Sequence, residues 1–274
     1  MSEHQVFDRI LVGVDGTDYG FEALLQALAL ARTEAAVRAV TALDLTGVVQ
    51  TGWDAPKFGE MLRHEAELIQ AKAQEILAGR PESAVSLVRG RPLAVLRREI
   101  GTFAPTLLAL GGRGRSRFLG ALLGETASTL LHDATCSVLL ARPHWGERWR
   151  PARVLVGVDG SEWSLAALRV ADELHDRLGS SVTVVAARGG KTIPTDGPWA
   201  DRVQEWDSAS AVEALWRRSV STDLVIVGSR GLHGIRALGS VSERVAHRVD
   251  CSVLVVRTGE QGVESRDPVG SGGR

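Results

Sequence analysis

Short apolar runs alternate with amphipathic stretches along the first half of the chain. Ile10–Val14 is typical of a strand, and Phe21–Ala36 carries apolar residues at helical spacing after two candidate N-caps, Thr17 and Asp18. The alternation continues and predicts strands at Val37–Leu43, Ala84–Val88, Thr106–Leu110 and Ser137–Leu140, and helices at Glu60–Leu77, Pro92–Ile100 and Thr126–His132. Strands alternating with helices predict βαβ crossovers, and the apolar strands fit a parallel sheet covered on both faces.

Three sequence blocks recur in the same order in both halves of the chain. RILVGVDG at 9–16 returns as RVLVGVDG at 153–160, LLALGGRG at 107–114 as LVIVGSRG at 224–231, and ATCSVLLAR at 134–142 as VDCSVLVVR at 249–257. This repetition indicates a duplicated α/β unit. We therefore expect one domain at 1–142, a linker at 143–151 bracketed by two prolines, a second domain at 152–258 and a disordered tail at 259–274, which is rich in Gly, Ser and charge.

The second copy is trimmed between its second strand and its glycine-rich loop. Its counterpart of Glu60–Leu77 is missing, and Arg188–Ala200, with the Gly and Pro content of a loop, stands there instead. The third strand is expected at Arg202–Trp206 and the next helix at Ser210–Arg218. The missing helix predicts an exposed apolar face where a protein partner or a second copy of the chain docks, or else that Trp199 folds back and covers the sheet.

Composition narrows the class of protein. Hydrophobic residues make up 44% of the chain and charged residues 24%, and the formal net charge is −1, which is ordinary globular composition without the basic excess of nucleic-acid binders. There is no secretory signal and no run of ~20 apolar residues, so we expect a cytoplasmic protein that binds neither membranes nor nucleic acid. Cys136 and Cys251 have no C-x-x-C partner, so neither a metal site nor a disulfide framework is predicted; we interpret both as small buried residues.

Two loops of each half lie where a doubly wound sheet binds ligands, at the carboxyl ends of strands beside the switch in strand order. The first loop offers Asp15 and Asp159, each of which could accept a hydrogen bond from a ribose or adenine, or could cap the following helix. The second loop begins with G-x-x-G at Gly111 and at Gly228 and leads into a helix, and such loops let backbone N–H groups approach phosphates. Neither loop holds the lysine of a P-loop.

The string VGSRGLHGIRALGSVSERVAHRVDCSVLVVR at 227–257, with VLVGVDGSEWS at 154–164, resembles the universal stress protein family. The resemblance covers residues 8–142 and 152–257. It implies two Rossmann-like, doubly wound parallel sheets in tandem, each with strand order 3-2-1-4-5, the second copy lacking one helix. In one branch of the family it also implies an ATP site marked by G-x-x-G, nine residues and G-[S/T]. The expected ligand is therefore ATP or another adenine nucleotide, with Mg²⁺ as a further candidate.

The resemblance also implies which residues form each site. Asp15 would lie at the adenosine and Ala42 would contact adenine through its backbone, while the ribose and phosphates would meet Gly111, Arg113, Gly114, Gly124 and Thr126. The second half would contribute Asp159, Ala186, Gly228, Arg230, Gly231, Gly239, Ser240 and Val241.

Both halves depart from the family's pattern. Glu125 puts a carboxylate where Ser or Thr would meet the phosphates, although three nearby arginines at 113, 115 and 117 could offset its charge. We expect the second half, which keeps Ser240, to bind the nucleotide better, although its loop is shorter by two residues and argues the other way.

These features predict an adenine-nucleotide-binding stress protein that signals through a ligand-dependent change of shape or partner. A nucleotide-free scaffold of the same fold is the alternative. His233 and His247 have no partner nucleophile in a recognisable frame, so we expect no catalytic residue and at most a slow ATPase. The apolar last strands, Ser137–Leu140 and Ser252–Val256, should pair antiparallel into an internal pseudo-dimer, as the resemblance also implies. That pairing would put the two cysteines at opposite ends, beyond the ~7 Å reach of a disulfide.

Overall fold

The computed structural model describes residues 7–46, 55–112, 123–144, 148–187, 199–229 and 241–258. The first half alternates strands and helices in the order β1 (Arg9–Gly13), α1 (Asp18–Leu30), β2 (Ala36–Leu43), α2 (Ala55–Leu77), β3 (Ser83–Arg89), α3 (Pro92–Phe103), β4 (Leu107–Gly111), α4 (Glu125–Asp133) and β5 (Ser137–Ala141).

The second half repeats this order without a counterpart of α2 among its described residues. It runs through β6 (Arg153–Val158), α5 (Glu162–Leu178), β7 (Ser181–Ala187), a 3-10 turn (Ala200–Arg202), β8 (Glu205–Asp207), α6 (Ala211–Ser219), β9 (Leu224–Gly228), α7 (Val241–Arg248) and β10 (Ser252–Val256).

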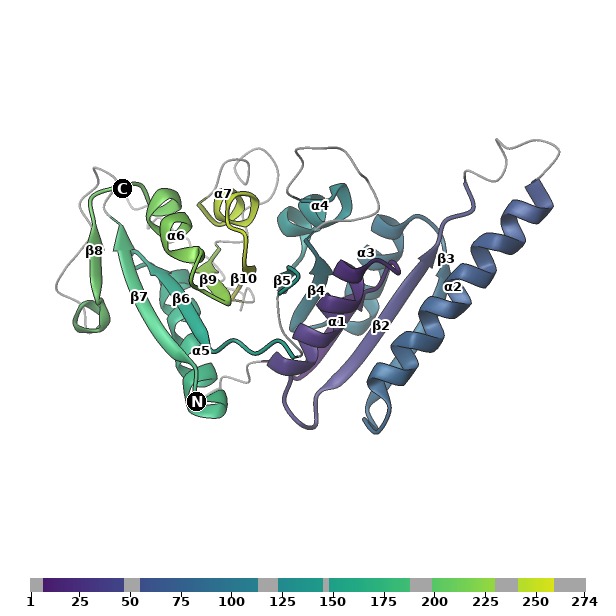
Figure 1. Ribbon diagram of the computed structural model, residues 1–274, viewed down its shortest axis with the longest axis horizontal. Coiled ribbons are helices and arrows are strands. Elements are labelled where there is room, and N and C mark those ends of the chain that lie inside the picture. The colour runs from purple at the N-terminus through teal and green to yellow at the C-terminus, as the bar shows by residue number, and fades with distance from the viewer. Residues whose placement is uncertain are drawn as a thin grey trace, which may run out of the picture.

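The strands join into one sheet in the order β3-β2-β1-β4-β5-β10-β9-β6-β7-β8 (Figure 1). Strand pairs within each half are parallel, so both halves have the order 3-2-1-4-5, and the predicted fold is confirmed. Helices α1, α2 and α5 contribute to one core layer and α3, α4, α6 and α7 to the other. No helix in the described ranges is long and apolar enough to span a lipid bilayer.

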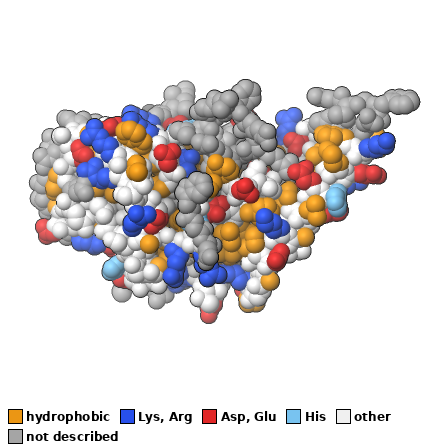
Figure 2. All heavy atoms as spheres, viewed as in Figure 1, with side chains coloured by type: hydrophobic (Ala, Val, Ile, Leu, Met, Phe, Trp, Pro, Cys, Tyr) orange, Lys and Arg blue, Asp and Glu red, His pale blue; other side chains and the backbone are white. Residues whose placement is uncertain are grey.

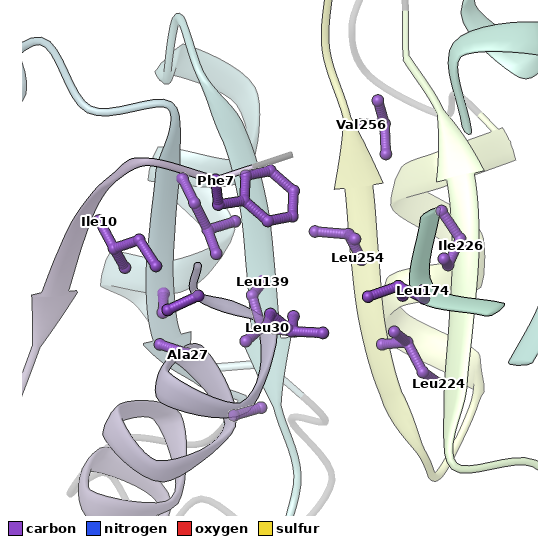
Figure 3. Packing of buried hydrophobic residues seen from close by; sticks show 14 of the residues in the cluster. Phe7, Ile10, Ala27, Leu30, Leu139, Leu174, Leu224, Ile226, Leu254 and Val256 are labelled. Atoms are coloured by element: carbon purple, nitrogen blue, oxygen red, sulfur yellow. The ribbon is translucent and has the colours of Figure 1, made fainter. Parts of the chain in front are cut away.

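The two halves meet through their last strands, as predicted. β5 and β10 pair antiparallel with Leu139 opposite Leu254, and Figure 3 shows these two side chains on facing strands. Cys136 and Cys251 precede opposite ends of this pair, and both are free thiols. Apolar edges that would otherwise be open to other chains are thus closed within one molecule.

A buried polar network ties α1 to the second half across this junction. The Gln26 amide nitrogen donates to the Arg142 carbonyl (2.8 Å), and the Ser252 hydroxyl donates to the Gln26 amide oxygen (2.6 Å). The Arg142 guanidinium in turn donates to the Ala246 carbonyl of α7 (2.6 Å). Because all three polar side chains are buried, each bond replaces one that water would otherwise supply, and losing a partner would be costly.

Two expectations about local structure are wrong. The first helix ends at Leu30 and not at Ala36, because Ala36 begins the strand that pairs with β1. The third strand of the second half begins only at Glu205, after the 3-10 turn. Of the two alternatives for the face left by the missing helix, the structure agrees with cover by Trp199, which is 7% exposed, while Val184 and Ala186 of β7 are fully buried.

Exposed large apolar side chains occur on both halves, at Leu25, Met61 and Leu68 in the first and at Trp206, Val220 and Val241 in the second. Met61 and Leu68 of α2 are 55% and 58% exposed, and Figure 2 shows hydrophobic side chains gathered over this helix. Most of the loop at 188–200, the linker residues 145–147 and the tail 259–274 lie outside the described residues.

Candidate functional site

The turn after the first strand has the same structure in both halves. Asp15 Oδ1 accepts hydrogen bonds from the Thr17 amide (3.1 Å) and hydroxyl (2.6 Å), and the Thr17 hydroxyl caps α1 by accepting from the Gly20 amide (3.1 Å). Asp159 binds Ser161 in the same way, at 3.0 and 2.6 Å. The aspartates therefore do not cap the helices themselves. They fix the capping residue at the carboxyl edge of the sheet.

A cavity of about 370 Å³ opens beside this turn in the first half. Its floor is formed by the carboxyl ends of β1, β2 and β4, and its sides by α2, α3 and the start of α4. The predicted residues that line it are Asp15, Ala42, Gly111, Gly124 and Thr126. The structure thus brings together all the predicted first-half residues that it describes; Arg113 and Gly114 lie outside the described residues.

Helix α2 supplies a wall of this cavity that the sequence did not reveal. At ~1.5 Å per residue its 23 residues span ~35 Å, whereas the seven residues of β3 span only ~23 Å. The N-terminal turns of α2 therefore extend past the edge of the sheet, as Figure 1 shows. Leu62, Ala66 and Ile69 of α2 line the cavity. The spacing of these apolar residues in the sequence predicts only that one face of the helix is buried. It does not show that this face lines a cavity.

The glycines at the ends of β4 and β9 are required by packing. A Cβ built on Gly111 would lie 2.9 Å from the backbone carbon and Cβ of Tyr19 in α1. A Cβ on Gly228 would overlap the Trp163 carbonyl of α5 in the same way. Close helix–strand approach therefore accounts for both glycines, although each also borders a cavity.

The start of α4 points its backbone donors toward the first cavity. Gly124 is the N-cap and supplies no side-chain cap, and Gly124, Glu125, Thr126 and Ala127 all line the cavity. The first N–H groups of a helix lack partners within the helix and carry a partial positive charge. Glu125 is exposed in this first turn, so its carboxylate competes with any anion bound there.

Four carboxylates line the first cavity, Asp15, Asp44, Glu65 and Glu125. Sequence reasoning missed Asp44 and Glu65, because a lone acidic residue after a strand or on a helix is usually a solvated group. Hydrogen bonds from the Thr46 hydroxyl (2.6 Å) and amide (2.9 Å) lower the pKa of Asp44, with Arg91 adding a smaller electrostatic effect. Among the residues that the structure describes, the lining contains no Lys or Arg.

The corresponding cavity of the second half is much smaller, about 100 Å³. Asp159, Gly228 and Val241 line it as predicted, together with residues of α6. Ala186 does not, because the register of β6 and β7 makes Ala187 the counterpart of Ala42, and Ala187 lines the cavity while Ala186 faces the opposite core layer. Arg230, Gly231, Gly239 and Ser240 lie outside the described ranges. The cavity sizes favour the first half, contrary to our expectation.

The remaining chemical candidates that the structure describes, Cys136, Cys251 and His247, line neither cavity. Burial raises the pKa of the Cys136 thiol to about 11 and that of Cys251 to about 12, so neither is a reactive thiolate near neutral pH. His247 lies in the last turn of α7, away from the residues that line either cavity, and His233 falls outside the described residues.

Comparisons with known proteins agree with this architecture. The sequence model of the universal stress protein family matches residues 7–142 and 195–257. Universal stress protein Rv2623 of Mycobacterium tuberculosis is 32% identical over 184 residues, which cover 55% of this chain and 61% of that protein, less than two thirds of its length. Universal stress protein Rv1996 of the same species is 27% identical over 314 aligned positions, covering 94% of this chain and 97% of the relative.

The solved structures include a similar fold over nearly the whole chain. A universal stress protein from Archaeoglobus fulgidus superimposes with a TM-score of 0.71 and 22% identity, covering 94% of this chain and 98% of the other. At this identity the likeness concerns the fold alone.

Proposed function

The chain belongs to the universal stress protein family, and from this premise we propose that its first half binds an adenine nucleotide, ATP in the first instance. The observation that carries the proposal is the cavity of about 370 Å³ at the carboxyl ends of β1, β2 and β4. Strand order reverses at β1, between β2 and β4, and this is where open α/β sheets bind ligands. The volume lies within the range of small-molecule sites.

The chemistry of the lining suits the two ends of a nucleotide differently. Leu62, Ala66 and Ile69 on one side and Val95 and Leu96 on the other form an apolar slot that matches a planar base. Asp15 stands at the slot's edge, where a carboxylate accepts hydrogen bonds from ribose hydroxyls. The base and sugar are therefore expected to supply most of the binding energy.

The phosphates would lie at the start of α4. Backbone donors at Glu125, Thr126 and Ala127 and the helix dipole favour an anion there, while the Glu125 carboxylate weakens that preference. The described residues contain no cluster of three or more His, Cys, Asp or Glu placed to hold a metal. Mg²⁺, which keeps waters and binds nucleotide phosphates, would therefore enter with the nucleotide.

We propose that the protein acts by binding and that hydrolysis is slow. A general base works best with a pKa near the operating pH. The Thr46 hydrogen bonds move the pKa of the lining carboxyl Asp44 in the opposite direction, downward. Signalling would then follow from whether the nucleotide is bound, through a change of shape or of protein partner.

Two measurements on the full chain test the proposal. Acid extraction of the purified protein, followed by nucleotide chromatography, should release an adenine nucleotide, or calorimetry should show ATP binding to protein freed of it. Asp15→Asn should weaken that binding. Asp159→Asn makes the same change in the same hydrogen-bond pattern of the other half and should leave the binding unchanged. Weakening by Asp159→Asn alone would move the site to the second half. If the protein retains no nucleotide and binds no ATP, the proposal fails and the alternative of a nucleotide-free scaffold is favoured.

A further inference from the structure

The two halves begin their sites identically and then diverge. Gly16 and Gly160 occupy the same left-handed conformation, with φ of 82° and 79°, in turns that share their hydrogen bonds. Yet the cavity beside the second turn has about 100 Å³ where the first has about 370 Å³. Something other than the turn therefore closes the second site.

The difference lies on the side of the sheet that α2 occupies in the first half. There Leu62, Ala66 and Ile69 of α2 line the same cavity as Asp15 of the turn. In the second half Trp199 belongs to the same core layer, together with Val158 and Ala186, and is only 7% exposed. Its indole packs directly on the turn, since a Cβ built on Gly160 would lie 2.8 Å from Trp199 Cζ2 and 3.2 Å from Cε2.

Several contacts hold the Trp199 indole in this position. The Trp206 ring packs beside it, with the ring centroids 6.1 Å apart, and Trp206 itself is fixed in β8 opposite Ala186. The 3-10 turn that follows Trp199 is anchored to α5, because the Arg202 guanidinium binds both carboxylate oxygens of Asp172 at 2.6 and 3.1 Å. A bidentate pair of this kind fixes geometry as well as adding energy. Trp199 therefore belongs to the packed core.

We infer that Trp199 fills, in the second half, the space that the first half leaves open for a base, so that Trp199 limits the chain to one nucleotide. The inference rests on the proposed nucleotide site of the first half. The second cavity that remains is lined by the start of α5 and by residues of α6 and α7, and Trp199 is not part of its lining. It is too small for an adenosine, because ligand sites for molecules of that size begin at ~300 Å³.

The test is the number of ATP molecules bound per full-length chain, measured by equilibrium dialysis and calorimetry. The natural chain should bind one, and Trp199→Ala should bind two. Trp216→Ala is the matched control and should still bind one, because Trp216 is a partly buried tryptophan of α6 that lines neither cavity and stacks under Arg248. Trp199→Leu, which removes the rings but keeps an apolar cover, should also bind two and serves if the alanine variant fails to fold.

A second pair of variants separates this inference from the proposed function. Trp199→Ala combined with Asp15→Asn should keep the new site and weaken the old one, and Trp199→Ala with Asp159→Asn should do the reverse. Binding of one ATP by the natural chain and by both Trp199 variants would overturn the inference and leave the proposed function standing. Two ATP molecules on the natural chain would also overturn it. Binding to the Trp199 variants alone would contradict the proposed first-half site, and of the inference it would leave only that Trp199 closes the second site.

Discussion

Glu125 should weaken ATP binding without affecting the binding of adenosine. Its carboxylate lies in the first turn of α4, exposed, and lines the cavity at the place where the phosphates would meet the helix N-terminus. Glu125→Gln keeps the size of the side chain and removes its charge. Because adenosine carries no phosphate, any electrostatic effect should appear with ATP alone.

The size of the effect follows from the exposure of Glu125. Two unit charges at ~4 Å repel by ~1 kcal/mol in water and by ~4 kcal/mol at an effective dielectric of ~20. The lower figure applies to an exposed group, so Glu125→Gln should tighten ATP binding by about fivefold, since ~1.4 kcal/mol corresponds to tenfold. The same change removes a favourable charge at a helix N-terminus worth ~0.3–1 kcal/mol, so the melting temperature of the unliganded protein should fall slightly.

Calorimetric titration of ATP and adenosine, at low and at high salt, checks this reasoning. Glu162→Gln is the matched control, because Glu162 is an exposed acid in the first turn of α5 that lines neither cavity. It should lower the melting temperature to a similar extent and leave ATP affinity unchanged. The reasoning fails if Glu125→Gln binds ATP no more tightly than the natural chain, or if adenosine affinity rises equally.

Three further predictions concern stability. Gly111→Ala should lower the free energy of unfolding in urea by ~1–3 kcal/mol, because its new Cβ meets the α1 backbone at 2.9 Å; Gly101→Ala, in an open stretch of α3, should instead stabilise by ~0.5–1 kcal/mol. Gln26→Ala should cost at least ~1–3 kcal/mol by leaving buried partners unsatisfied, unlike Leu25→Ala next to it on the exposed face. Burial raises the pKa of Cys136 to about 11. The free energy of unfolding should therefore be constant below about pH 8.5, the pKa of an unfolded cysteine, and fall as the pH rises toward 11. In the same urea assay this fall should be less steep for Cys136→Ala.

The sequence predicts most of the fold because its signals are local and repeated. Apolar runs give the strands, and recurrence of the same blocks fixes which strands correspond, so the order in each half and the pairing of β5 with β10 follow. The end of α1 could not be predicted in this way. Ala31–Ala36 continues a helical composition, but in the folded chain Ala31 is already extended, the Arg32 amide donates to the Phe7 carbonyl and Ala36 pairs with Arg9.

The site is less accessible to sequence reasoning because its walls come from distant elements. The turn at Asp15 and the helix start at Gly124 are local motifs and were predicted. The wall formed by α2 depends on the length of that helix relative to the strands. The register between β6 and β7, which places Ala187 and not Ala186 at the second cavity, depends on a shift of one residue that spacing alone does not reveal.

The loss of one helix connects the fold of the second half to its closed site. A parallel sheet must be covered on both faces, and in the first half α2 covers one face while extending ~12 Å beyond the strands, so that cover and cavity coexist. No such helix occurs among the described residues of the second half, where side chains that lie directly on the sheet supply cover. Trp199 is one of these side chains, and with its ring packed on Gly160 the cavity that remains beside the turn has only about 100 Å³. The requirement to bury the sheet and the requirement to keep a cavity open therefore conflict in the second half, and burial prevails there.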